Sequence, residues 1–315
     1  MRLSVVLPTH NRPGLLPEAV ASVRAQTWCD WELIVVDDGS SPPASKGDDA
    51  NLGSRLGWLR NDPAQGPSQA RNRGIEAACG DVVTFLDDDD LLSTGMLEAI
   101  ARGFEQHPEL ECLFVNVDPF GASAEGMRAN QQRNLVALLQ RLGSPQAQQG
   151  VVLLGSNLFE ALLGGLPLAF QRVAIRRSAL SKTGLYAGNS FGDLEWNFRV
   201  ALRCRCALLL QPLYRVRCEG QSFFTRNDAR QRLNEELMRI YAQLAALPEV
   251  RAHPALGRRL RGKLAEAHFD KAYLALTAGQ RMPWGHYWRS LAAGLAWRHV
   301  SLLLRWAARA RPAEG

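Results

Sequence analysis

Short apolar strands that alternate with helical segments constrain the fold of this chain more than any other feature. Four apolar runs have the length of a buried strand and occupy residues 3–7, 31–36, 82–86 and 112–117. A shorter strand candidate surrounds Trp58. Apolar residues recur at helical spacing in three of the intervals between these runs, at residues 16–26, 66–80 and 97–104. This order predicts an α/β fold with a mostly parallel sheet that helices cover on both faces.

Two acidic clusters directly follow two of the predicted strands. Asp37 and Asp38 end the second strand, and residues 87–90 are four consecutive aspartates after the strand at 82–86. Ligands of such sheets bind at the carboxyl ends of the strands. Two carboxylates at 4 Å repel by roughly 4 kcal/mol at an effective dielectric of 20, and a divalent cation between them relieves this repulsion. The clusters therefore indicate a metal ion that also binds a substrate diphosphate.

Each acidic segment also has a purely structural interpretation. Residues 37–40 form a turn sequence that suits Asp and Gly. Residues 87–90 end a strand, and Asp90 is expected to cap the helix that follows whatever its neighbours do. A third acid, Asp193, is either a general base or a helix N-cap, and its spacing to Trp196 and Val200 favours the cap.

The charge of the chain is unevenly distributed. Residues 226–315 carry 16 Lys and Arg against 7 Asp and Glu, a net charge of +9, whereas residues 1–225 have a net charge of −3. We therefore predict that residues 1–225 form the domain that carries the chemistry, which needs carboxylates, and that residues 226–315 form a basic helical region. Two apolar stripes in that region, at residues 284–295 and 297–304, are out of phase and predict a helix break near Gly294. The stripes are expected to pack on the first domain or on a second subunit; contact with an anionic membrane surface is the alternative.

Three features of the sequence predict the cellular location of the protein: the N-terminal apolar run, the spacing of the cysteines and one later apolar segment. The apolar run at the N-terminus is too short for a secretory signal, and the six cysteines include no Cys-x-x-Cys pair. Residues 151–170 are apolar but contain Asn157 and Glu160, and a carboxylate at a bilayer centre costs roughly 2.5–3.5 kcal/mol. We expect a cytoplasmic protein, either free or on the inner face of the cell membrane. Residues 121–165 lack a clear pattern and are expected to be mobile structure on the acceptor side.

Several of these segments, taken in order, resemble glycosyltransferase family 2, the inverting enzymes with the GT-A fold. The similar segments are residues 5–12, 31–40, 70–75, 80–81, 85–90 and 192–199. Residues 85–90 look like the segment with the metal-binding Asp-x-Asp motif, and residues 192–199 like the segment that supplies the catalytic base. The resemblance covers about residues 3–225 and implies a GT-A sheet followed by a C-terminal helical region.

The resemblance also implies roles for individual residues. Asp193 would take the proton from the acceptor hydroxyl, and Asp89, assisted by Asp87, would ligate Mn²⁺ or Mg²⁺. Asp38 would contact the base or ribose while Asp37 supports the turn. The remaining residues of the donor site would be Pro8, Thr9, Arg12, Arg71, Asp87 and Asp88. The implied reaction is transfer of a sugar from a nucleoside diphosphate sugar, by resemblance a UDP-sugar, to a hydroxyl of a saccharide or lipid-linked acceptor in cell-envelope polysaccharide synthesis.

The sequence departs from the family at two places. The segment at residues 214–222 has no His where members often carry one, so Arg217 is expected to face the phosphates. The Gln-x-x-Arg-Trp signature of processive synthases is absent, which predicts a non-processive enzyme. Two alternatives remain: a sugar-nucleotide pyrophosphorylase, which would want a Gly-rich loop after the first strand, and a sugar-nucleotide-binding scaffold without catalysis, which should lack one of the three acidic sites. No nucleic-acid partner is predicted.

Overall fold

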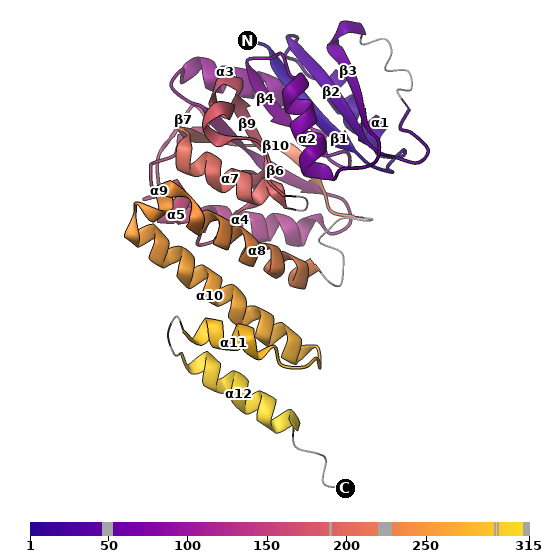
Figure 1. The fold of residues 1–315 in the computed structure, drawn as a ribbon. Coiled ribbons are helices and arrows are strands. Elements are labelled where there is room, and N and C mark those ends of the chain that lie inside the picture. The colour runs from indigo at the N-terminus through magenta and orange to yellow at the C-terminus, as the bar shows by residue number, and fades with distance from the viewer. Residues whose placement is uncertain (46–52, 189–190, 220–228, 293, 295, 311–315) are drawn as a thin grey trace. The chain divides into compact units, whose positions relative to one another are not determined.

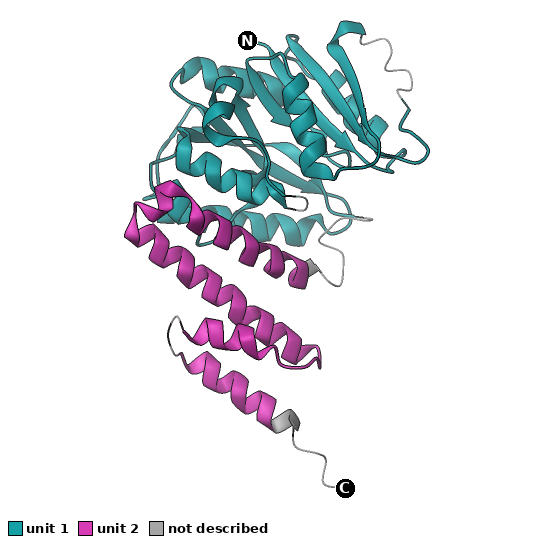
Figure 2. Cartoon of the chain, viewed as in Figure 1, with its two compact units in different colours: residues 1–222 teal, residues 223–315 magenta. Residues whose placement is uncertain are grey.

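The computed structural model describes residues 1–315 except 46–52, 189–190, 220–228, 293, 295 and 311–315. The described chain divides into two compact units, residues 1–222 and 223–315 (Figure 2). The boundary predicted between residues 225 and 226 lies outside the described residues. Each unit has a hydrophobic core of its own.

A single mixed sheet forms the centre of the first unit (Figure 1). Its strand order is β3-β2-β1-β4-β9-β6-β10-β8-β7, and β5 pairs with β10. The strands with parallel neighbours are β1 (Leu3–Thr9), β2 (Trp31–Asp38), β3 (Leu56–Asn61), β4 (Val82–Phe85), β6 (Cys112–Phe120) and β10 (Cys206–Arg217). The strands with only antiparallel neighbours are β5 (Leu91–Leu92), β7 (Ala147–Gln148), β8 (Val151–Leu153) and β9 (Val173–Arg176). The predicted α/β fold with a mostly parallel sheet is confirmed.

Helices lie on both faces of this sheet, as predicted. They are α1 (Leu16–Arg24), α2 (Pro67–Ala77), α3 (Met96–Gln106), α4 (Ala124–Arg141), α5 (Leu158–Leu162), α6 (Leu180–Thr183) and α7 (Gly192–Arg203), with short 3₁₀ turns η2 (Leu168–Gln171) and η3 (Arg177–Ala179). Successive side chains of a strand point to opposite faces. Leu3 and Val5 of β1 therefore enter the core that contains α1 and α3, while Val6 points towards α2.

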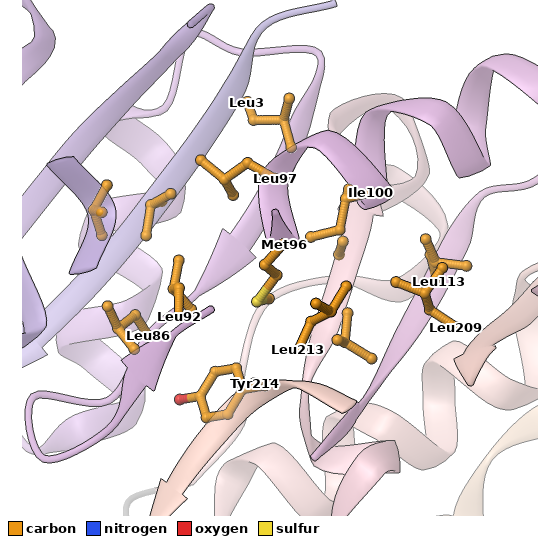
Figure 3. Close-up of a cluster of buried hydrophobic side chains, with 14 of the residues drawn as sticks. Leu3, Leu86, Leu92, Met96, Leu97, Ile100, Leu113, Leu209, Leu213 and Tyr214 are labelled. Atoms are coloured by element: carbon orange, nitrogen blue, oxygen red, sulfur yellow. The ribbon is translucent and has the colours of Figure 1, made fainter. Parts of the chain in front are cut away.

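The core that contains α1 and α3 is built from buried, mostly aliphatic side chains of strands and helices that are distant in sequence (Figure 3). Leu3 of β1, Leu97 and Ile100 of α3 and Leu113 of β6 are all inaccessible to solvent. Burial of one such side chain contributes about 1.5–3 kcal/mol. This packing fixes the edge of the sheet at which β1, β2 and β4 end.

Residues 121–165, which were expected to be mobile structure on the acceptor side, contain the helix α4 of 18 residues. Its sequence is rich in Ala, Gln, Arg and Leu, which have high helix propensity. Only Ala124, Gln131, Leu135 and Leu138 are buried, so the helix has a narrow apolar stripe. That narrow stripe explains why periodicity alone did not reveal it.

The second unit is helical throughout its described part, as predicted. Its helices are α8 (Ala229–Ala246), α9 (Pro248–Arg251), α10 (Pro254–Thr277), α11 (Trp284–Leu291) and α12 (Trp297–Ala310). The predicted helix break is confirmed, because Gly294 adopts φ 137° between α11 and α12. Among the helices of the described residues, none has the length and apolar character needed to cross a membrane.

Candidate active site

The acidic clusters meet at the edge of the sheet where β1, β2 and β4 end. In the parallel register, Thr9 of β1 lies beside Asp37 of β2. The Leu86 amide, just after β4, donates to the carbonyl of Val6 at 3.0 Å. Pro8 is buried within β1, one residue before its end. The convergence expected from the strand order is therefore present.

Asp37 is the second-last residue of β2 and is completely buried. Its carboxylate accepts hydrogen bonds from the amides of Ser40 at 2.9 Å and Ala44 at 3.0 Å, and it pairs with Arg60. Burial alone would raise the pKa of Asp37, but these bonds, led by those from Ser40, hold the pKa below its ordinary value. Asp37 supports the turn in this structure.

Asp38 connects β2 with the start of α2. Its carboxylate accepts hydrogen bonds from Asn61 Nδ2 at 2.7 Å and from the amides of Gln65 and Gly66 at 2.9 and 2.8 Å. Gly66 is the N-cap of α2. His10 Nδ1 lies 2.6 Å from the Asp38 carbonyl oxygen, which ties the end of β1 to this turn. The role of Asp38 towards a nucleotide stays a prediction.

Arg12 supplies positive charge to two of the consecutive aspartates. Its Nη1 lies 2.9 Å from Asp88 Oδ1 and 2.6 Å from Asp89 Oδ2. Thr9 Oγ1 donates to the other Asp88 oxygen at 2.8 Å. Burial opposes the charge of Arg12, yet Asp88 and Asp89 raise the pKa of the guanidinium. Burial is the largest influence on Asp88 and raises the pKa of that carboxyl.

Asp87 lies between two arginines whose side chains are mostly buried. Arg71 Nη2 of α2 approaches Asp87 Oδ1 to 2.5 Å, and Arg172 Nη2 lies 3.5 Å from Oδ2. The Asp87 amide donates to the Tyr214 hydroxyl at 3.1 Å. Although burial acts in the opposite direction, Arg71 and then Arg172 lower the pKa of Asp87. Asp87 is therefore a carboxylate with two cationic neighbours.

Asp90 does not cap a helix, so that prediction is wrong. The strand β5 intervenes, and the next helix, α3, has Gly95 as its N-cap. Asp90 is buried and accepts the amide of Arg217 at 2.8 Å, while Arg172 Nη2 lies 3.1 Å from its other oxygen. Burial is the main reason that the pKa of Asp90 rises to about 7. Asp90 joins β10 to the acidic segment.

Asp193 is not a helix N-cap either. Phe191 is the N-cap of α7, with a left-handed φ of 56° and no side-chain capping bond, and Asp193 lies inside the first turn. The charge of Asp193 acts on Arg71 and Arg172. Burial lowers the pKa of each of these arginines, but their acidic and tyrosine neighbours raise it above the ordinary value overall. Asp193 thus belongs to the same charged cluster as Asp87.

Several contacts hold α7 next to the charged cluster that contains Asp87. Trp196 stacks on Tyr186 with ring centroids 4.6 Å apart, and its Nε1 donates to the Gly184 carbonyl at 2.8 Å. Asn72 of α2 exchanges two hydrogen bonds with the backbone of Tyr186, at 2.9 and 3.0 Å. Arg199 pairs with Glu195 and donates hydrogen bonds to backbone carbonyls of the segment that precedes α7. The contacts of Trp196 and Arg199 position Asp193.

The α7 helix approaches α2 closely at its first residue. A Cβ atom on Gly192 would lie 2.2 Å from Ser68 Oγ, so only glycine fits there without a local shift. Ser68 is in the first turn of α2, the helix that carries Arg71 and Asn72. The first turns of α2 and α7 are therefore in direct contact beside Asp87.

The sequence did not reveal three members of the site. Arg172 forms ion pairs with Asp87 and Asp90. The Tyr214 hydroxyl accepts a hydrogen bond from the Asp87 amide. The aromatic ring of Tyr186 lies near the Arg71 guanidinium. Burial raises the pKa of both tyrosines. A single arginine before a short apolar strand is unremarkable in sequence. Its role follows from the position of β9, which pairs with β4.

Arg217 contacts the acidic segment from the end of β10. Its Nε donates to the carbonyl of Asp89 at 2.9 Å, and Nη2 lies 2.7 Å from Glu18 of α1. Nη1 lies 3.3 Å from Glu219. The side chain thus anchors the backbone beside Asp89, and its predicted phosphate-facing role stays a prediction. Residues 220–222 of the same segment lie outside the described part.

The acidic segment fits one kind of cation site. Within the described residues, no group of three or more His, Cys, Asp or Glu side chains is arranged to hold a metal ion. Mg²⁺ and Mn²⁺ are also bound by one or two carboxylates whose remaining ligands are water and substrate phosphate oxygens. The Asp89 side chain is 24% exposed and already contacts a cationic group, Arg12. The donor set therefore suits a divalent ion that arrives with a diphosphate.

Comparison with known proteins finds a family match over part of the chain. The family model described as Glycosyl transferase family 2 matches residues 4–149. The "GalNAc(5)-diNAcBac-PP-undecaprenol beta-1,3-glucosyltransferase" of Campylobacter jejuni is 40% identical over 109 residues, which are 32% of this chain and 34% of the relative. The "UDP-Glc:alpha-D-GlcNAc-diphosphoundecaprenol beta-1,3-glucosyltransferase WfgD" of Escherichia coli is 34% identical over 96 residues, 30% of this chain and 38% of the relative. The chain thus matches little more than a third of the length of these relatives.

Solved structures share the fold at low sequence identity. S. aureus TarS, residues 1–349, superposes with a TM-score of 0.63 and 16% identity over 96% of this chain and 81% of that chain. The mannosyltransferase PcManGT of Pyrobaculum calidifontis, in complex with GDP-Man and Mn²⁺, gives a TM-score of 0.53 and 17% identity over 98% of this chain and 80% of that chain. Residues 4–149 of this chain therefore match glycosyl transferase family 2, and the chain shares its fold with these solved structures.

Proposed function

We propose that this chain is a non-processive, inverting glycosyltransferase that moves a sugar from a UDP-sugar to a hydroxyl of a saccharide or lipid-linked acceptor. The observation that carries the proposal is the convergence of Asp87, Asp89 and Asp193, with Arg12, Arg71 and Arg172 among them. A site for transfer from a nucleoside diphosphate needs both kinds of charge, because a diphosphate leaves and a proton is removed. The names of the relatives suggest a place in cell-envelope polysaccharide synthesis.

The donor is proposed to bind where β1, β2 and β4 end. Structures of TarS with UDP and with UDP-GlcNAc, and the name of the E. coli relative, favour a uridine nucleotide. We assign the nucleotide pocket to Pro8, Thr9, Arg12, Asp37, Asp38 and Arg71, with Asp87 and Asp88 nearest the sugar and phosphates. Arg12 is the residue best placed to respond to a diphosphate, because it is 31% exposed and already lies between two acidic groups.

Asp89 is the carboxylate that we assign as the direct ligand of Mn²⁺ or Mg²⁺, and Asp87 is assigned to assist it. Asp87 already has Arg71 and Arg172 as partners, whereas Asp89 has the more exchangeable Arg12. When bound, the divalent ion would neutralise charge on the departing nucleoside diphosphate.

Asp193 is assigned as the base that removes the proton of the acceptor hydroxyl. As the proton moves to the Asp193 carboxylate, the acceptor oxygen forms a bond to the anomeric carbon. The bond from that carbon to the phosphate oxygen breaks, and its electron pair leaves with the nucleoside diphosphate. Attack from the side opposite the leaving group inverts the configuration. The contacts of Trp196 and Arg199 keep Asp193 in position for this step.

Replacement of Asp193 by asparagine tests the proposed base. We expect Asp193→Asn to reduce turnover by roughly 10²–10⁴-fold, the usual contribution of a general base, while UDP binding is unchanged. UDP release from a panel of UDP-sugars, with Mn²⁺ and with saccharide or lipid-linked acceptors, measures the activity, and calorimetry measures UDP binding. The control is Asp118→Asn, since Asp118 pairs with Arg128 at the surface of unit 1. Turnover by Asp193→Asn equal to that of the control would contradict the assignment.

Two assays distinguish the alternative functions. A binding scaffold would bind UDP-sugar but release no UDP with any acceptor. A pyrophosphorylase would form UDP-sugar from UTP and a sugar 1-phosphate and would release pyrophosphate. Its expected Gly-rich loop after β1 is replaced here by His10, Asn11 and Arg12, and Arg12 is paired with the acidic segment. We therefore expect no product in that assay.

A further inference from the structure

The outer face of α12 exposes large apolar side chains to solvent. Trp297 is 76% exposed and Leu304 is 61% exposed. They are seven positions apart in the sequence, so they lie about two turns apart on one side of the helix. Exposed apolar side chains that gather on one face commonly mark a contact with a partner or a membrane.

The opposite face of α12 is fixed by the core of the second unit. His299 is completely buried, with its Nε2 atom 3.0 Å from Ser290 Oγ of α11 and its ring centroid 5.1 Å from that of Phe269 of α10. Leu302 is buried in the same core. These contacts set the rotation of α12 about its axis, and that rotation directs Trp297 and Leu304 outward.

The apolar ridge of Trp297 and Leu304 is flanked by arginines. Arg298 and Arg305 directly follow the two ridge residues and are both exposed. Residues 271–313 contain seven Lys and Arg and no Asp or Glu. Arg298 also lies over the Phe269 ring and acts on the carboxylate of Asp270, so Arg305 is the first candidate for a new anionic partner. An apolar ridge with Trp and flanking Arg is typical of a helix that lies in a membrane interface.

We propose that the outer face of α12 docks on an anionic lipid surface. Trp297 and Leu304 enter the boundary between headgroups and acyl chains, and Arg305, with Arg298, contacts lipid phosphates. A second copy of the chain is a poorer partner, because a two-fold contact of this face would bring like-charged arginines together without a carboxylate from residues 271–313. Anionic headgroups supply the missing negative charge. The inference does not depend on sugar transfer.

Vesicle sedimentation with the full chain tests this proposal. We expect the protein to sediment with vesicles of phosphatidylcholine and phosphatidylglycerol, less with phosphatidylcholine alone, and less as salt is raised. The double variant Trp297→Ala/Leu304→Ala should lower the partition coefficient by about tenfold or more, because two apolar side chains no longer leave water. Arg305→Gln should lower it by about fivefold.

A matched control removes exposed apolar side chains elsewhere. Val136 and Leu153 of the first unit are 43% and 38% exposed, and Val136→Ala/Leu153→Ala should bind vesicles like the unmodified protein. Circular dichroism verifies that the variants are folded. The proposal is overturned if the protein ignores anionic vesicles or if the α12 double variant binds them unchanged. It is also overturned if light scattering shows a dimer that only the α12 double variant abolishes, since a second copy would then cover this face.

Discussion

At the scale of single residues, each aspartate of the acidic segment is matched to an arginine from another part of the chain. Asp88 and Asp89 share Arg12, while Asp87 and Asp90 share Arg172. These pairs relieve the repulsion among four consecutive carboxylates. A metal ion or a diphosphate that enters the site must therefore compete with interactions that already exist.

Replacement of Arg12 tests this competition. In Arg12→Gln, Asp89 loses its cationic partner, so we expect Mn²⁺ to bind roughly fivefold more tightly without nucleotide, equivalent to about 1 kcal/mol. UDP should bind more weakly, because a positive charge near the diphosphate is lost. Titration of free Mn²⁺ by electron paramagnetic resonance and of UDP by calorimetry measures both effects. Weaker binding of Mn²⁺ to the variant would contradict the competition.

The pKa of Asp37 gives a prediction about stability and pH. A carboxyl with a lowered folded pKa contributes stability above its unfolded pKa, and this contribution is lost as the pH falls through the folded value. Asp37→Asn should cost about 1–3 kcal/mol at neutral pH, because buried hydrogen bonds and the pair with Arg60 are broken. The difference from the unmodified protein should shrink below about pH 4.

Urea denaturation at several pH values measures this difference. Asp62→Asn is the control, since Asp62 also lies near Arg60, at 3.6 Å, but its side chain is 76% exposed. An exposed pair of this kind contributes at most about 1 kcal/mol. If Asp37→Asn cost no more than this control at neutral pH, the support of the turn by Asp37 would be refuted.

At the scale of elements, α2 links the sheet, the acidic segment and α7. Gly74 lets α2 approach β1, since a Cβ atom there would lie 2.2 Å from Val6 Cγ1 and 3.2 Å from Val6 Cβ. One turn earlier, Arg71 and Asn72 contact Asp87 and the backbone of Tyr186. The distance between α2 and β1 therefore determines where Arg71 meets the acidic segment.

Two glycine substitutions separate close packing from helix propensity. Gly74→Ala should lower stability by about 1–3 kcal/mol, because the added methyl group meets Val6 in a filled core, and it should also reduce transfer activity. Gly126 of α4 has no atom within 4 Å of an added Cβ, so Gly126→Ala should stabilise the chain by up to about 1 kcal/mol. Thermal denaturation compares the two. Equal effects would show that the contact of α2 with β1 is not tight.

At the scale of the whole molecule, the two compact units differ in charge and in kind of surface. The acidic residues with predicted chemical roles all belong to residues 1–222, while the Trp-rich and Arg-rich helices α11 and α12 belong to residues 223–315. Binding of donor and metal should therefore raise the free energy of unfolding of the first unit. The predicted division of labour between the two parts of the chain stays a proposal.

Linked thermal stabilisation tests whether nucleotide and metal bind together. We expect UDP with Mn²⁺ to stabilise the chain by about 2.7 kcal/mol at a ligand concentration of 100 Kd, and UDP with a chelator to stabilise it much less. In Asp89→Ala the dependence of UDP binding on Mn²⁺ should be lost. Differential scanning calorimetry measures the shift in Tm. Full metal-dependent stabilisation of Asp89→Ala would rule out Asp89 as the ligand.

The succession of strands and helices along the first half of the chain, the positions of both acidic clusters and the helical nature of the C-terminal part could all be predicted from the sequence. Strand and helix periodicity are local properties, and acidic residues at strand ends are visible in any reading of the chain. The resemblance to the family rests on the same local segments. These features needed no knowledge of which strands pair.

Which groups meet across the site depends on the tertiary structure. Arg172 reaches Asp87 because β9 lies antiparallel between β4 and β6. Asp90, which was predicted to cap a helix, is instead buried and accepts a hydrogen bond from the backbone of β10. Asp193 sits inside the first turn of α7 because Phe191 takes the left-handed N-cap position. Pairings between residues more than eighty positions apart depend on sheet order and helix packing, which leave no periodic signal in the sequence.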